Sequence, residues 1–303
     1  MKLVSALLSL LFVMAVACSS GSDSVLPPAS SDAVSPTTDS LGSTSSGIQS
    51  TPTPKPEYSD VPSRSGIVKA IDGGTFLSLG TDPPTLDPHL NTDAASAVYA
   101  VEIFGGLMTI DKDLVVVGDL AETWYVSQDG ATTTFRLRPG ATFHNGRPVT
   151  ANDVKWSLER AADPLTESFN ASVFLNDILG VSDRLTGLAN NISGVQVIDD
   201  RTLTITTDAP KAYFLSKLTY PVSFVLDREN VSTGKSWILE PNGTGPFKLA
   251  EYRPGEVLRL AKFENYHLEP AKIDEVEFLL SGGNSMLMYE NDELHITGIP
   301  LTL

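Results

Sequence analysis

The sequence predicts a mixed α/β fold in which a few helices are combined with many short strands. Two observations carry this prediction. Apolar residues recur at helical spacing in some segments, whereas other segments alternate apolar and polar residues between tight turns. No unit of about 20 to 50 residues repeats, which argues against a solenoid. Helices mixed with hairpin-joined strands are typical of α+β or mixed α/β layers.

The first predicted strand is Thr75–Leu79, where apolar and small polar residues alternate. Prolines 83, 84 and 88 follow and oppose regular strand pairing. The run from Ala94 to Thr109 carries apolar residues at helical spacing, and it predicts a helix that Gly105-Gly106 ends or bends. The residues expected on its buried face are Val98, Val101, Ile103, Phe104 and Leu107.

A hairpin and a capped helix come next. The strand at 124–127 leads into the turn Gln128-Asp129-Gly130, after which residues 131–137 alternate again. Thr150 is placed as the N-cap of a helix, and Asp153 is placed to reach back to its amide. Further strands are predicted at 194–198, 202–206, 247–252, 257–260 and 273–279.

The amino terminus has the anatomy of a secretory signal. Met1-Lys2 precedes an apolar core that ends in small residues at Ala17, so residues 1–17 are predicted to be a signal peptide. The apolar run is shorter than the about 20 residues that a membrane-spanning helix needs. Cys18 follows it directly and resembles the cysteine of a bacterial lipobox, which is acylated and anchors the protein to the membrane. The alternative is an ordinary signal with an incidental cysteine.

Composition narrows the class of protein further. Residues 18–64 are rich in Ser, Thr and Pro and are predicted to be a disordered tether, because they offer too little apolar surface to bury. Cys18 is the only cysteine, so no intramolecular disulfide can form. The chain has 21 basic and 37 acidic residues, a net charge of −16, without a Lys/Arg cluster. This balance argues against nucleic acid as a partner.

No convergent catalytic, metal or cofactor motif is visible. The 4 histidines lack the spacing that places two imidazoles on one helix face, and no GxSxG motif occurs. Two weak matches overlap: Ser232 and Lys235 have the S-x-x-K spacing of serine acyl enzymes, and Gly234-Lys235-Ser236 resembles the tail of a P-loop. Glu229 stands where that P-loop needs a glycine. A loop before Trp237 is the preferred interpretation, and an anchored hydrolase is the alternative.

A glycine-punctuated loop, Asn242-Gly243-Thr244-Gly245, precedes the strand at 247–252. Its glycines indicate close approach of a backbone or a ligand, or simply tight turns.

Several strings of residues stand in a fixed order along the chain. They are Thr85-Leu86-Asp87-Pro88-His89, Ala121-Glu122-Thr123-Trp124, Ser127-Gln128-Asp129-Gly130, the runs 134–140 and 143–154, Thr244-Gly245-Pro246-Phe247, and Asn265-Tyr266 with Ile273-Asp274-Glu275-Val276. In this order they resemble the family 5 solute-binding proteins, the oligopeptide, dipeptide and nickel receptors of ABC importers. The resemblance covers nearly the whole folded part of the chain, from about residue 75 to residue 296. The runs 177–191 and 281–292 depart most from the family pattern.

The resemblance implies a periplasmic-binding-protein-like clamshell, type II and cluster C-like. Residues 65–104 and 228–303 would form an incomplete lobe I, and residues 105–227 a domain inserted into it. The run 134–154 would then be structural. Family members are about twice as long as the folded part, so the second lobe is expected to be missing. The apolar end of the chain, Ile296–Leu303, likewise predicts a piece of a larger protein.

The implied function is that of an extracytoplasmic substrate-binding lipoprotein, anchored at the outer face of the cell membrane or in the periplasm. It would be a monomer, not an enzyme, capturing peptides or similar small solutes without a cofactor for ABC permease subunits. A non-transport surface receptor on the same fold is a further alternative. Lobe I alone is expected to bind ligand weakly or not at all, and the ligand class stays open because the acidic residue that pairs with a peptide ammonium lies in the other lobe.

The resemblance also implies the ligand-lining residues of lobe I. They are Thr92, Asp93 and Ala94, then Phe169 and Asn170, and finally Gly298 and Ile299. The alternative for the first group is that these residues are only the start of a helix, with Asp93 as its cap.

Overall fold

The computed structural model describes residues 72–298, which belong to one compact unit. The predicted signal peptide, the predicted lipidation site Cys18 and the predicted tether lie outside the described residues. Within 72–298, no helix has the length and apolar character needed to cross a membrane.

The strands are β1 Thr75–Leu79, β2 Met108–Ile110, β3 Val116–Gly118, β4 Ala121–Val126, β5 Thr132–Leu137, β6 Val195–Asp199, β7 Thr202–Thr206, β8 Phe247–Arg253, β9 Val257–Lys262 and β10 Glu275–Leu279. The α-helices are α1 Ala94–Ile103, α2 Ala151–Ala161, α3 Phe169–Phe174, α4 Val181–Leu185, α5 Phe214–Lys217, α6 Arg228–Val231 and α7 Ser285–Glu290, and the 3-10 helices are η1 Pro164–Thr166, η2 Pro221–Ser223 and η3 Lys235–Leu239.

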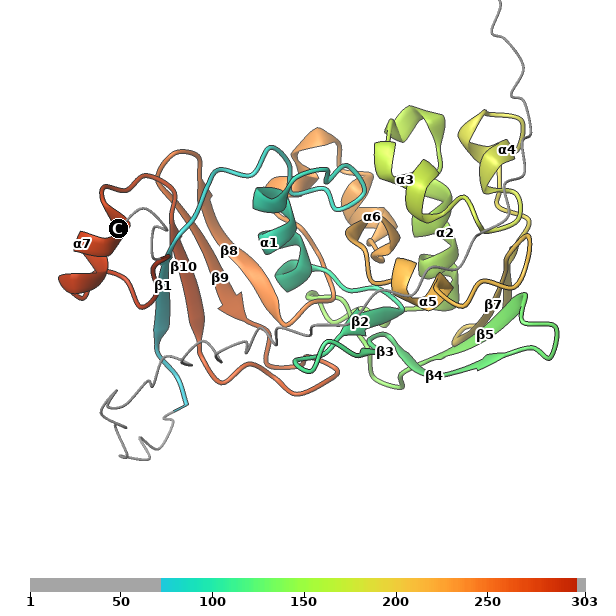
Figure 1. The fold of residues 1–303 in the computed structure, drawn as a ribbon, viewed down its shortest axis with the longest axis horizontal. Coiled ribbons are helices and arrows are strands. Elements are labelled where there is room, and N and C mark those ends of the chain that lie inside the picture. The colour runs from blue at the N-terminus through green and yellow to red at the C-terminus, as the bar shows by residue number, and fades with distance from the viewer. Residues whose placement is uncertain (1–71, 299–303) are drawn as a thin grey trace, which may run out of the picture. The chain divides into compact units, whose positions relative to one another are not determined.

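Two four-stranded sheets organise the fold (Figure 1). The first has the order β1-β10-β9-β8, with β1 parallel to β10 and the other pairs antiparallel. The second has the order β4-β5-β7-β6 and is antiparallel throughout. Strands β2 and β3 form a separate pair. The predicted mixture of helices with hairpin-joined strands is confirmed.

The β4–β5 hairpin forms where the turn residues predict it. The Ser127 amide donates to the Thr132 carbonyl at 2.8 Å, and the Gly130 amide donates to the Ser127 carbonyl at 2.9 Å. Gly130 has a φ of 72°, a conformation that glycine adopts without steric cost. Phe135 and Leu137 alternate with exposed or half-buried neighbours and are fully buried. The local sequence alone therefore suffices to place this element.

Helix α2 begins with the predicted capping box. The Asp153 amide donates to the Thr150 hydroxyl, and the Thr150 amide donates to the Asp153 carboxylate at 2.8 Å. These bonds satisfy amides that the first turn of a helix leaves without partners. Val154 and Leu158 lie on the buried face, and α2 packs against β6. Figure 1 shows α2, α3 and α4 on one side of the second sheet.

Helix α1 differs from the prediction in its buried face and in its length. Val98 and Val101 were expected inside, but they are 48% and 45% exposed. Ile103, Phe104 and Leu107 are buried as predicted. Ser96, Tyr99 and Ala100 complete the face of α1 that packs against the first sheet. The prediction was wrong for the two valines because they lie about a third of a turn away from Tyr99. The helix also ends at Ile103, before the glycines, and the end of the predicted run forms β2.

Buried apolar side chains gather in two clusters. One, here called the β4–β7 core, lies under the second sheet and includes Phe135, Phe143 and Leu158. The other, called the β8–β10 core, lies between α1 and the first sheet and includes Tyr99 and Trp237. The clusters meet at residues 224–226, where Val225 belongs to the β4–β7 core and its two neighbours belong to the β8–β10 core. Successive side chains of an extended segment point to opposite sides, so residues 224–226 contribute to both cores.

The loop at residues 242–245 is explained by close approach of a backbone. A Cβ added at Gly243 or Gly245 would overlap backbone atoms at the end of α1, in Ile103 and Glu102. The Gly245 amide donates to the Ile103 carbonyl at 2.9 Å. Of the readings that the sequence left open, backbone approach is therefore the one that the fold requires.

Substitution of Gly243 by alanine is expected to lower the free energy of unfolding by about 2 kcal/mol, because the loop must move away from α1. Urea denaturation measures the effect. Gly283→Ala is the matched control, since nothing lies within 4 Å of a Cβ added there. Equal stability of the two variants would contradict the packing argument.

Candidate functional site

The first group of predicted ligand-lining residues forms the start of α1. The Asp93 carboxylate caps the helix by accepting from the Ser96 amide at 2.8 Å and from the Ser96 hydroxyl at 2.9 Å. Thr92 and Ala94, on either side of it, are exposed. The capping role of Asp93, which the sequence left as the alternative, is present in the structure. Both carboxylate oxygens of Asp93 accept hydrogen bonds from Ser96, whereas Thr92 and Ala94 remain accessible.

The second group lies at the start of α3, and two hydrogen bonds through Asn91 join it to the first. The Asn170 side-chain amide donates to the Asn91 carbonyl at 2.5 Å, and the Asn91 side chain accepts from the Asp93 amide at 3.1 Å. Asn170 is buried, whereas Phe169 is 71% exposed. The structure thus brings residues 92–94 and 169–170 together, although 75 or more positions separate them along the chain.

The third group is placed elsewhere. Gly298 lines a cavity of about 420 Å³ together with Ser78 and Leu79 of β1 and Ser285 of α7. Figure 1 shows α7 and α3 on opposite sides of α1. Ile299 lies outside the described residues. Within the described part of the chain, no hydrogen bond joins Gly298 to either of the other groups.

A buried histidine supports the segment that carries residues 92–94. His89 Nδ1 lies 2.9 Å from the Arg160 guanidinium, which can only donate, so Nδ1 accepts. The other ring nitrogen, Nε2, must then carry the proton and donate to the Phe224 carbonyl at 2.9 Å. Burial, followed by the charge of Arg160, lowers the pKa of His89 to about 4. His89 is therefore neutral near pH 7.

A second histidine is fixed in the same tautomer. His144 Nδ1 accepts from the Gly243 amide at 3.3 Å, and its Nε2 lies 3.1 Å from the Gly245 carbonyl. Burial, with a smaller contribution from the charge of Lys248, lowers the pKa of His144 to about 4. His144 therefore ties the 143–150 segment to the glycine loop. Its role here is structural, because both ring nitrogens are occupied by backbone groups.

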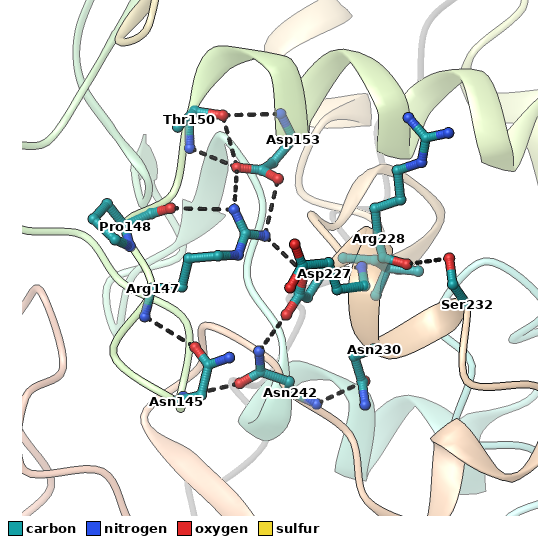
Figure 2. Close-up of polar contacts among 12 residues, drawn as sticks. Asn145, Arg147, Pro148, Thr150, Asp153, Asp227, Arg228, Asn230, Ser232 and Asn242 are labelled. Atoms are coloured by element: carbon teal, nitrogen blue, oxygen red, sulfur yellow. Dashed lines mark hydrogen bonds and ion pairs between the residues drawn. The ribbon is translucent and has the colours of Figure 1, made fainter.

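Arg147 is the centre of a second polar network, which Figure 2 shows in close-up. Its guanidinium donates to both oxygens of Asp153, at 3.0 and 3.2 Å, and to Asp227 at 2.8 Å. Asp227 also accepts from the Asn242 side chain at 2.6 Å, and Asn242 in turn accepts from the Asn145 amide. The network joins the start of α2, the start of α6 and the glycine loop. This agrees with a structural role for the run 134–154.

A hollow of about 640 Å³ lies beside this network. Its wall carries the acidic side chains of Asp227, Glu229, Glu240 and Glu251, and a single lysine, Lys248. Asp227 is held by Arg147 and Asn242, so its carboxylate already has protein partners. The hollow contains none of the predicted ligand-lining residues.

The residues considered for catalysis do not converge. Ser232 donates its hydroxyl to the Arg228 carbonyl at 2.7 Å, an interaction drawn in Figure 2. Lys235 and Ser236 lie in η3, so the predicted loop before Trp237 is in fact a 3-10 helix. It forms because the Trp237 amide reaches back to the Gly234 carbonyl, which places the indole in the β8–β10 core. Across residues 72–298, no group of three His, Cys, Asp or Glu side chains could hold a metal ion.

Residues 115–302 match the model of the bacterial extracellular solute-binding proteins, family 5 Middle. The chain belongs to this family. The resemblance inferred from the collinear strings is confirmed, and the fold is that of the periplasmic-binding-protein-like members of family 5.

Several characterised family 5 proteins are similar to this chain. The dipeptide-binding protein DppE of Bacillus subtilis is 30% identical over 236 residues, which are 75% of this chain and 43% of DppE. The glutathione-binding protein GsiB of Salmonella typhi is 30% identical over 191 residues, which are 63% of this chain and 34% of GsiB. The chain therefore spans less than half the length of these relatives.

Solved structures agree with the sequence relatives. The Escherichia coli murein tripeptide binding protein MppA is 26% identical with a TM-score of 0.68, and the match covers 74% of this chain and 45% of MppA. Haemophilus influenzae OppA in complex with the peptide RPPGFSPFR is 27% identical with a TM-score of 0.68, over 73% of this chain and 45% of OppA. The described fold thus corresponds to part of a clamshell.

Sequence reasoning did not assign a role to Arg147, Asp227 or Arg160. The Arg147–Asp153 pair had a local signal, because Asp153 was recognised as a cap and lies six residues away. The pairs Arg147–Asp227 and Arg160–Asp87 had no local sequence signal, since more than 70 positions separate the partners in each pair.

Proposed function

We propose that this protein is the substrate-binding lipoprotein of a peptide-type ABC importer, anchored outside the cytoplasm through Cys18, and that it captures peptides or similar small solutes as a monomer. The observation that carries the proposal is the range of ligands named for its relatives: a dipeptide, glutathione, a murein tripeptide and a nine-residue peptide. All of them contain amide or peptide groups. A binding role, not an enzymatic one, is consistent with these relatives.

Thr92, Asp93 and Ala94, together with Phe169 and Asn170, are proposed to line the ligand cleft on the lobe I side. Their proximity and the exposure of Thr92, Ala94 and Phe169 support this assignment. An exposed aromatic ring beside accessible chain at a helix start offers an apolar contact and polar groups to one extended ligand. Gly298 and Ile299 are proposed to contact the ligand from the β1 side.

The proposed domains are lobe I, at 65–104 and 228–303, and an inserted domain at 105–227. The division is supported by the separation of the β4–β7 core from the β8–β10 core and by their meeting at residues 224–226. The ligand would be bound between lobe I and a second lobe, and closure would present the complex to the permease. A ligand drives such a closure only through contacts that are made in the closed state alone.

Peptide binding to this chain is expected to be weak but site-specific. Tri- to pentapeptides and glutathione at millimolar concentration should shift the NMR signals of amides at 91–94 and 168–170, whereas a disaccharide should not. Asn170→Ala removes the bond to Asn91 and is expected to weaken peptide binding about tenfold, the effect of losing one buried hydrogen bond. Ser232→Ala is the matched control and should bind as the wild type does.

Two outcomes would contradict the proposal. Peptide-induced shifts confined to the acidic hollow at 227–252 would place the ligand elsewhere. Covalent labelling of Ser232 by a β-lactam probe, detected by mass spectrometry, would favour the hydrolase instead.

A further inference from the structure

Arg160 lies in the last turn of α2 and makes a forked contact with the chain segment ahead of α1. Its two terminal nitrogens donate to the two oxygens of Asp87, at 3.2 and 2.6 Å. One of them also donates to His89 Nδ1 at 2.9 Å. The side chains of Arg160 and Asp87 are 15% and 4% exposed, and the guanidinium lies 5.7 Å from the centre of the Trp237 ring. This ion pair is therefore largely shielded from solvent.

The fork holds Asp87 and His89 in a single arrangement. The His89 amide donates to Asp87 Oδ1 at 3.0 Å, so the carboxylate is bonded both to Arg160 and to its own loop. On the other side of its ring, His89 Nε2 donates to the Phe224 carbonyl. A planar guanidinium can satisfy a carboxylate and an imidazole together, whereas a lysine ammonium is a point donor.

From His89 the network divides toward the two groups of predicted ligand-lining residues. The Ser168 hydroxyl donates to the His89 carbonyl at 2.5 Å and caps α3, whose first residue is Phe169. Two residues after His89, Asn91 accepts from Asn170 and from the Asp93 amide. Both groups are thus attached to the short segment 87–91 that Arg160 fixes.

We propose that Arg160 is a positioning residue of the ligand-lining face, which sets the placement of residues 92–94 and 169–170 relative to each other through Asp87 and His89. That this face contacts the ligand rests on the proposed function. The mechanical coupling of the two segments rests only on the contacts above. If Arg160 is lost, the buried Asp87 carboxylate has no ion-pair partner and the segment 87–91 must move toward water. The two groups then move together, because each is bonded to that segment.

Amide hydrogen exchange measured by mass spectrometry on the ligand-free chain tests the coupling. Arg160→Met is expected to accelerate exchange roughly tenfold in both 85–93 and 168–172, relative to the wild type. Arg160→Lys should give the same pattern, because an ammonium cannot replace the fork. Ile205→Ala, a buried change in β7 within the β4–β7 core, is the control for general loss of stability and should leave these two segments unchanged relative to the rest of the chain.

Acceleration of only one segment, of neither, or of all segments equally would overturn the proposal, as would full restoration by Arg160→Lys. If Arg160→Met does not fold, Asp87→Asn combined with Arg160→Met removes the unpaired charge and is judged by the same pattern.

Peptide-induced NMR shifts separate this proposal from the proposed function. Equal peptide affinity of wild type and Arg160→Met would overturn positioning, whereas a wild type that binds no peptide would overturn the proposed function and leave the exchange result to decide the coupling.

Discussion

Lowering the pH from 7 to 4 is expected to reduce the free energy of unfolding by about 3 kcal/mol for each of two buried histidines, His89 and His144. Both have a pKa lowered from 6.5 to about 4 in the folded protein, chiefly by burial. In the unfolded chain each binds a proton near pH 6.5. The stability is therefore fully present above pH 6.5 and is lost as the pH falls toward 4.

Burial is the main reason why both histidines resist protonation in the folded protein, and the hydrogen bonds at Nδ1 act in the same direction. In each ring Nδ1 accepts a hydrogen bond, from Arg160 in His89 and from the Gly243 amide in His144. A proton on Nδ1 would turn an acceptor into a second donor and, at His89, place two cations in contact. The protonated rings can be accommodated only if these contacts break.

Urea denaturation at intervals between pH 7 and 4 measures the effect. His89→Gln and His144→Gln are each expected to remove about half of the loss of unfolding free energy that the two histidines cause between pH 7 and 4. The double variant should remove all of that loss, because the effects of independent sites add. Carboxylates also titrate in this range, so the difference between each variant and the wild type is the quantity to compare. A variant whose pH dependence matches that of the wild type would show that its histidine is not buried as described.

Arg147→Met is expected to lower the free energy of unfolding by about 3 kcal/mol at pH 7, the cost of leaving buried carboxylates without their cation. Asp227 is 2% exposed and Arg147 is 30% exposed, so the pair is only partly screened by water. Burial alone would lower the pKa of Arg147, but hydrogen bonds and charge from Asp153 and Asp227 raise it overall. The bonds from Asn242 and the Glu229 amide to Asp227 remain and limit the loss.

Thermal and urea unfolding test this prediction against two reference variants. Lys112→Met breaks an ion pair whose partners are mostly exposed, so it is expected to cost less than about 1 kcal/mol. Asp227→Asn added to Arg147→Met should recover part of the stability, because the unpaired charge is then gone. A cost for Arg147→Met no larger than that for Lys112→Met would mean that the network in Figure 2 contributes little.

Elements that depend on near neighbours could be predicted from the sequence. The β4–β5 hairpin and the capping box of α2 are formed by residues within a few positions of one another, so the local pattern suffices. Helix α1 shows the limit. Its apolar spacing favoured Val98 and Val101, but Ser96 is buried instead because its hydroxyl is bonded to the Asp93 carboxylate. A polar residue with a local partner can occupy a buried face that periodicity reserves for apolar ones.

The sequence by itself determined the mixed α/β class, most strands, the cap of α2 and membership of the solute-binding family, because these depend on local spacing and on strings of consecutive residues. Only the tertiary structure decided that Arg160 meets Asp87, 73 positions away, and that Arg147 meets Asp227, 80 positions away. It also decided that residues 92–94 lie beside 169–170, through the bond from Asn170 to Asn91. The physical reason is that a buried charge must find a partner wherever the packed chain provides one, and that partner need not be near it in sequence.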